Sequence, residues 1–101
     1  MIVETKKDLI YILKLHQKTI NKFGINKLGI FGSFVRDEVN QNSDIDILVT
    51  FKPEQKTFNN YMNLAFFLED LLGRKIDLIT EESLSCIFGD KILKEVEYVE
   101  I

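Results

Sequence analysis

The chain has a single cysteine, Cys86, among 101 residues, so it has no partner for an internal disulfide. A chain without disulfides suits a reducing compartment such as the cytosol. Its apolar runs are much shorter than the roughly 20 residues that cross a membrane as a helix. Residues 1–8 lack the apolar core of a secretory signal peptide. We therefore expect a cytoplasmic protein with no membrane segment.

Basic residues are fewer than acidic ones: 13 Lys and Arg stand against 16 Asp and Glu, a net charge of −3 at pH 7. An acidic chain does not attract nucleic acid electrostatically, so we expect no direct nucleic-acid partner. If the protein handles polyphosphates, metal cations must offset the repulsion. The chain is 46% apolar and 29% charged, as in an ordinary folded protein. Its length predicts a single domain over residues 1–101.

Proline is as scarce as cysteine, and the only one lies in residues 52–60, which we expect to be a loop. Helices are predicted on either side of it. An apolar stripe at helical spacing runs through residues 9–23, after a capping signal at Thr5. A second stripe covers residues 61–72, and a third helix should begin at Asp90.

Three short apolar runs predict strands, at residues 28–31, 45–51 and 75–79. The middle run is apolar on both faces with its charges at one end, which is typical of a strand covered on both sides. A brief helix from Ser33 to about residue 38 should follow the first strand, and the last residues should fray or extend. The sequence therefore predicts a small α/β (α+β) domain in which helices flank a sheet of three to four strands.

Aspartates interrupt two of these strands, although Asp is depleted from strands in general. Asp44 and Asp46 stand at i and i+2 and share one face, roughly 6.6 Å apart along the chain. Asp77 repeats the anomaly in the next strand. If the two strands are neighbours, three carboxylates meet at one rim of the sheet, where their repulsion favours a bound cation. The alternative is a solvated strand end with three unrelated surface acids.

A Gly-Ser step precedes the aspartates, at the turn between the first strand and the short helix. Backbone N–H groups at Gly32 and Ser33, with the serine hydroxyl, could hold a phosphate, although Ser33 could equally be a plain helix cap. Arg36, one turn later, could reach the same phosphate or bind a structural carboxylate. No His or Lys in the motif could activate Ser33, so we do not interpret it as a nucleophile.

Two adjacent aromatic residues, Phe66 and Phe67, widen the apolar face of the helix predicted over residues 61–72. They could belong to the core or to a surface that binds a partner. We expect core packing for both.

Together these motifs resemble the DNA polymerase β-type nucleotidyltransferase superfamily. The segment 32–36 reads Gly-Ser-Phe-Val-Arg, and it is followed by the Asp44–Asp46 pair and the later Asp77. The compact length and the run over residues 28–36 look most like the minimal nucleotidyltransferases, the MNT-type antitoxins. The resemblance extends over nearly the whole chain. It implies a polymerase β-like fold with a mixed sheet, and transfer of a nucleoside monophosphate from a nucleoside triphosphate to a hydroxyl.

The same resemblance implies roles for the motif residues and a partner. Gly32, Ser33 and Arg36 would hold the triphosphate of ATP. Asp44 and Asp46 would bind two Mg²⁺ ions, and Asp77 would bind the catalytic one and help activate the acceptor hydroxyl. Members of the MNT group are encoded beside HEPN-domain ribonuclease toxins, which they silence by adenylylating a tyrosine as well as by binding. This chain departs from the pattern at one place, with Asp37 where the family usually has Gly.

We therefore expect a magnesium-dependent nucleotidyltransferase that acts as an antitoxin, transferring AMP to a hydroxyl of a HEPN-type toxin and releasing pyrophosphate. One alternative is a binding module that inhibits its partner by steric cover, in which the aspartates would not matter. Another is a nucleotidyltransferase that acts on a small molecule or an RNA end. The acidic balance argues mildly against RNA, and the short chain argues against a complete small-molecule pocket.

Overall fold

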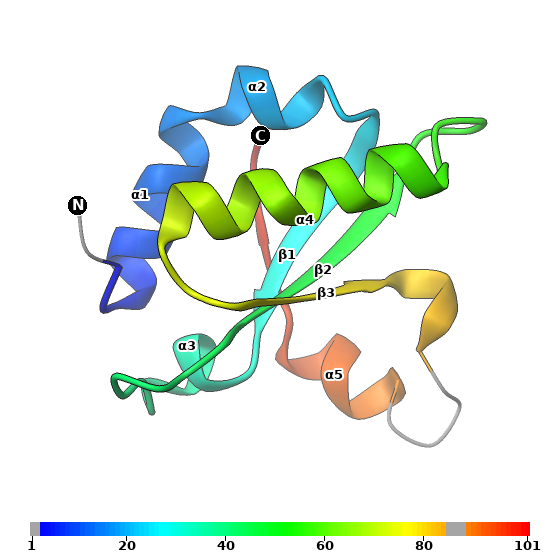
Figure 1. Ribbon diagram of the computed structural model, residues 1–101. Coiled ribbons are helices and arrows are strands. Elements are labelled where there is room, and N and C mark those ends of the chain that lie inside the picture. Colours follow the sequence, from blue (N-terminus) through cyan, green and yellow to red (C-terminus); the bar gives the residue numbers. More distant parts are fainter. Residues whose placement is uncertain (1–2, 85–88) are drawn as a thin grey trace.

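The structure is a computed structural model that describes residues 3–84 and 89–101 (Figure 1). Its helices and strands, in chain order, are α1 (Lys6–Leu15), α2 (Gln17–Asn21), β1 (Ile25–Phe31), α3 (Ser33–Arg36), β2 (Ile45–Phe51), α4 (Phe58–Leu72), β3 (Ile76–Thr80), the 3-10 helix η1 (Glu81–Ser83), α5 (Gly89–Glu95) and β4 (Glu97–Val99). In this part of the chain, no helix has the length and apolar character needed to cross a membrane.

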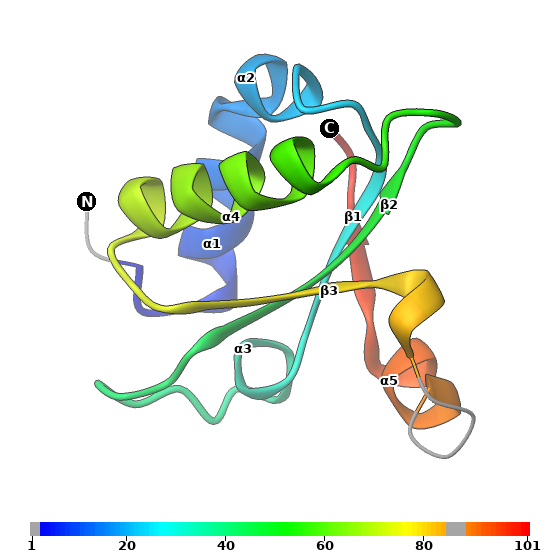
Figure 2. The ribbon, with the colours of Figure 1, turned by 45° about the vertical axis from the view of Figure 1, so that its right-hand side comes forward.

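The four strands form one mixed sheet in the order β3-β2-β1-β4. β1 pairs antiparallel with both β2 and β4, whereas β2 pairs parallel with β3. A parallel pair needs a long crossover, which α4 supplies here. Figures 1 and 2 show α1, α2 and α4 on one face of the sheet, and α3 and α5 near the end at which β1 stops and β4 starts. The α/β class and the mixed sheet flanked by helices are confirmed.

The core lies between the sheet and the layer of α1, α2 and α4. Most of its members are aliphatic side chains from these helices and from all four strands, among them Leu9, Leu13, Ile20, Leu64, Leu68, Ile30, Ile47, Leu78 and Val99. Val3 and the aromatic Phe34 of α3 belong to it as well. Leu48 is fully buried as well, although it stands outside this cluster. Both faces of β2 are therefore covered near its middle, as the sequence pattern predicts.

Capping residues explain where two helices begin. The Thr5 hydroxyl accepts a hydrogen bond from the Asp8 N–H at 3.1 Å, so the predicted cap of α1 is confirmed. The predicted start of the second long helix at residue 61 is wrong by three residues. Thr57 caps α4 in the same way, accepting from the Asn60 N–H at 3.1 Å, and the helix begins at Phe58.

Other parts of the sequence-based prediction need correction. The helix expected over residues 9–23 breaks at His16 into α1 and α2, and β1 begins at Ile25 rather than at residue 28. Of the two options expected for the last residues, fraying or extending, the structure shows the second, because β4 is an extended strand that pairs with β1. Phe67 is partly buried against Phe23, but Phe66 is 61% exposed, so its assignment to the core is wrong. Cys86 lies outside the described residues.

Candidate active site

The three aspartates that the sequence singles out lie on two neighbouring strands. Asp46 of β2 stands opposite Asp77 of β3 in the parallel register, and Asp44 directly precedes β2. Paired residues of parallel strands point to the same face, on strands about 4.8 Å apart. The Tyr61 hydroxyl donates to the Leu78 carbonyl at 2.5 Å and so ties α4 to the strand that carries Asp77. The fold therefore gathers all three carboxylates at one rim of the sheet.

Of the three aspartates, Asp46 has the environment least favourable to a negative charge. It is partly buried, whereas Asp44 and Asp77 are exposed. Burial raises the pKa of the Asp46 carboxyl to about 6, with further contributions from the carboxylates of Asp77 and Asp44. A divalent cation bound beside Asp46 would remove this penalty, so the donor chemistry fits a metal ion.

The carboxylates do not form a closed cage. Within residues 3–84 and 89–101, no group of three Asp, Glu, His or Cys side chains is arranged to hold a metal ion by itself. Mg²⁺ is commonly bound by one or two carboxylates and completes its coordination with water and substrate phosphates. The rim of β2 and β3 matches this kind of open site.

Gly32 forms the turn that brings β1 against the aspartates. Its backbone has φ 75° and ψ −149°, a region that side-chain-bearing residues avoid. A Cβ atom at this position would collide with the Asp46 carboxylate. Gly32 is also the N-cap of α3, so Ser33 is the first helical residue and not the cap. The plain capping role considered for Ser33 therefore belongs to Gly32.

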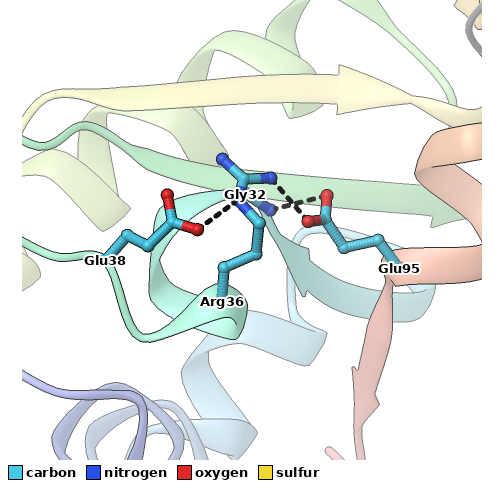
Figure 3. Close-up of polar contacts among 4 residues, drawn as sticks. All are labelled: Gly32, Arg36, Glu38 and Glu95. Atoms are coloured by element: carbon cyan, nitrogen blue, oxygen red, sulfur yellow. Dashed lines mark hydrogen bonds and ion pairs between the residues drawn. The ribbon is translucent and has the colours of Figure 1, made fainter.

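Arg36 lies between two carboxylates in Figure 3. Its Nη1 atom is 2.5 Å from Oε1 of Glu95, and its Nε atom is 3.4 Å from Oε1 of Glu38. Glu95, first by hydrogen bond and then by charge, raises the pKa of Arg36. The other carboxylate oxygen of Glu95 accepts from the Gly32 N–H at 3.2 Å. Of the two roles open to Arg36, the structure shows the one with a carboxylate.

The helix α5 forms part of the site, which sequence reasoning missed. A pocket of about 330 Å³ lies between the Gly32 turn, Asp46 and α5, and Lys91 and Glu95 are on its wall. Their i, i+4 spacing is ordinary for a helix surface, so nothing local in the sequence marked them. A larger cavity of about 750 Å³ lies near Gln17 and Tyr98 and contains none of the predicted site residues. We take the smaller pocket as the candidate site because three of the predicted site residues, Gly32, Arg36 and Asp46, line it.

Arg74 is a second residue that the sequence did not reveal. It precedes β3 and reaches back to the segment that leads into Asp44. Its Nη1 atom donates to the carbonyls of Asn40 and Ser43 at 3.0 and 2.9 Å. Its Nε atom donates to the Val3 carbonyl at 2.8 Å, and the guanidinium lies 5.3 Å from the Phe34 ring centre. One planar group thus fixes the turn before the first aspartate.

We expect Arg74→Lys to lower the free energy of unfolding by about 1–3 kcal/mol, because an ammonium group cannot satisfy these carbonyls in one plane or stack on Phe34. Urea unfolding followed by circular dichroism measures the loss. Lys75→Arg, a change at an exposed neighbour, is the control and should leave the midpoint unchanged. Equal midpoints for Arg74→Lys and the native chain would contradict the role given to Arg74.

Asp37 stands where the resembling family usually has Gly, and the structure explains how it is accommodated. The residue has φ 59° and ψ 40°, the left-handed conformation that ends α3. Glycine adopts this conformation most easily, and Asp is among the few other residues that adopt it readily. Asp37 can therefore form this turn, and its side chain is exposed.

The comparisons with known proteins agree with this geometry. The family model of the nucleotidyltransferase domain matches residues 6–100. The chain belongs to this family. The protein adenylyltransferase MntA of Thermococcus cleftensis is 38% identical over 100 residues, which cover 98% of this chain and all of that protein.

Solved structures show the same fold. One described as a candidate minimal nucleotidyltransferase has a TM-score of 0.79 at 27% identity, covering 92% of this chain and 94% of the other. The MNT antitoxin of Shewanella oneidensis, solved in complex with a tri-AMPylated HEPN toxin, has a TM-score of 0.56 at 21% identity. That comparison covers 84% of this chain and 69% of the other, and at this identity it shows a shared fold alone.

Proposed function

We propose that this nucleotidyltransferase transfers AMP from ATP to a hydroxyl of a HEPN-type toxin, with two Mg²⁺ ions at the rim of β2 and β3, and thereby neutralises the toxin. The observation that carries the proposal is the placement of Asp46, which lies opposite Asp77, against the Gly32 turn, with its pKa raised to about 6. Three carboxylates gathered beside a phosphate-binding turn are suited to metal-assisted phosphoryl transfer.

The residues have distinct roles in the proposed reaction. Gly32, Ser33 and Arg36 would hold the triphosphate. Asp44, Asp46 and Asp77 would hold the magnesium ions, which would neutralise charge on the phosphates. The acceptor oxygen attacks the α-phosphorus in line, and the bond to the bridging oxygen of pyrophosphate breaks. The acceptor proton passes toward Asp77. Because little else is required, catalysis consists mainly of positioning and charge neutralisation.

A protein acceptor suits the dimensions of the site. The pocket of about 330 Å³ is at the small end of the range usual for ligand sites, roughly 300–1,000 Å³. It leaves little room for a small-molecule acceptor beside a nucleotide, so the acceptor must bring its own recognition surface. The relative named a protein adenylyltransferase supports a protein as acceptor. The neighbour that shares the fold was solved with a tri-AMPylated toxin, and we propose a toxin as the acceptor here as well. We propose the cytoplasm as the place of action. We propose a tyrosine as the acceptor residue.

The test is to mix the chain with the purified HEPN-type toxin, ATP and Mg²⁺ and to measure the intact mass of the toxin. We expect the mass to rise by one AMP or more and the ribonuclease activity to fall, and EDTA should prevent both because it removes the magnesium ions. A toxin that is inhibited without a change of mass would support the binding module instead. A toxin that is neither modified nor inhibited would contradict both.

A further inference from the structure

The carboxylate of Glu95 contacts two groups that can also bind a phosphate. It accepts from the Gly32 N–H at 3.2 Å and pairs with the Arg36 guanidinium at 2.5 Å (Figure 3). A backbone N–H at a turn together with a guanidinium is a common arrangement for binding phosphate oxygens. The Glu95 side chain is 21% exposed and comes from α5, which borders the pocket.

The position of Glu95 is poorly explained by the stability of α5 itself. It is the last residue of the helix, where the helix dipole disfavours a negative charge. It also lies near Asp46, and its charge is one of those that raise the pKa of that residue. The Gly32 N–H and Arg36 are the groups that favour a carboxylate at this place.

A released Glu95 carboxylate has a second partner on its own helix. Lys91 precedes it by one turn on the same face and borders the same pocket. In residues 3–84 and 89–101, the ion pairs of the structure do not include Lys91. The helix therefore offers a cation that can receive Glu95 without a change in the fold.

We propose that Glu95 is an internal competitor of the nucleotide, which occupies the Gly32 N–H and Arg36 until the triphosphate displaces it. This inference rests on the proposed function, because it takes the Gly32 turn and Arg36 as the place of the triphosphate. Glu95 thereby sets the affinity for ATP, although it takes no part in the chemistry. Arg36 has both of the roles open to it, in succession: it binds a carboxylate in the free protein and the nucleotide phosphates in the complex.

Binding of ATP in the presence of Mg²⁺, measured by calorimetry, tests the proposal. We expect Glu95→Gln to lower the dissociation constant roughly tenfold, since the variant keeps the shape but loses the competing charge. Glu95→Asp keeps the charge but is shorter, and it should bind ATP with intermediate affinity. Glu97→Gln is the matched control. It removes the same charge two residues later, from a side chain that pairs with Lys6, and should bind like the native chain.

A second readout needs no catalysis. The chain has two arginines, Arg36 and Arg74, so their side-chain Nε–H signals can be resolved in an NMR spectrum. Glu95→Gln should shift the Arg36 signal of the free protein, and ATP should bring the native chain and the variant to the same Arg36 position. The Arg74 signal should stay in place throughout.

The possible outcomes separate this inference from the proposed function. ATP that binds the native chain and Glu95→Gln equally well, or the variant more weakly, would overturn the role of Glu95 and leave the proposed function intact. Equal tightening in Glu97→Gln would assign the effect to net charge and also overturn it. ATP that binds neither the native chain nor the variants would overturn the proposed function and this inference together.

Discussion

Asp46→Asn should abolish transfer of AMP to the toxin and at the same time stabilise the metal-free protein. The two effects have one cause, which is the negative charge that Asp46 holds among other carboxylates. In the proposed reaction this charge binds the magnesium ions, and its loss should lower the transfer rate by about 1,000-fold or more, or roughly 4 kcal/mol of the barrier. In the metal-free protein the same charge lowers the free energy of unfolding.

The expected gain in stability depends on pH in a defined direction. The pKa of Asp46 is about 6 in the folded chain and about 3.9 in an unfolded one, so the folded state binds the proton more tightly. Ionisation of Asp46 therefore destabilises the native chain fully above pH 6, and this penalty fades as the pH falls toward 4. At 1.36 kcal/mol per pKa unit the ceiling is near 3 kcal/mol, and solvent screening of a partly exposed group reduces it to about 1–2 kcal/mol.

Thermal unfolding in EDTA, at several pH values from 5 to 7.5, measures the difference. Asp46→Asn should unfold at a higher temperature than the native chain at pH 7.5, and the gap should narrow at pH 5. Asp70→Asn, at an exposed position of α4, is the control for loss of one negative charge. An unchanged or lower unfolding temperature for Asp46→Asn would mean that the carboxylates at this rim are not crowded.

The features of this molecule that could be predicted from the sequence are those encoded by residues close together in the chain. Apolar stripes, the cap at Thr5 and the alternation around Asp46 and Asp77 all act within one turn or one strand, so they can be recognised without coordinates. Such signals also located Asp46 and Asp77 on strands. That the two strands are neighbours stood only as a condition in the sequence, and the structure supplies their parallel pairing.

What sequence reasoning missed depends on contacts between distant residues. Glu95 meets Arg36 across 59 positions, and Arg74 meets the Val3 carbonyl across 71. β4 has only three residues and exists because β1 provides its partner. Each of these features is ordinary in its local sequence and gains its role only when the sheet brings the partners together.

Gly32→Ala should lower the free energy of unfolding and abolish nucleotide binding. A second glycine in the chain, Gly73, allows the effect of backbone strain to be separated from the effect of the collision with Asp46. Alanine at position 32 would meet two penalties: a backbone conformation close to exclusive to glycine, and a collision of its Cβ with the Asp46 carboxylate. We expect the two penalties together to lower the free energy of unfolding by about 2–4 kcal/mol. The total for a small protein is typically roughly 5–15 kcal/mol. The variant should therefore fold, with a displaced Asp46.

Gly73→Ala is the matched control, because it carries only the first kind of penalty. Gly73 ends α4 with φ 67°, and a Cβ there would meet no atom within 4 Å. Gly73→Ala should lower the free energy of unfolding by about 1–2 kcal/mol, the cost of a left-handed conformation, and should leave ATP binding unchanged. Urea unfolding and ATP calorimetry on the two variants measure both quantities. Equal losses of stability in the two variants, with ATP binding kept in both, would mean that the Asp46 side chain can move away from the new methyl group. The close approach of the Gly32 turn to Asp46 would then not be required for the site.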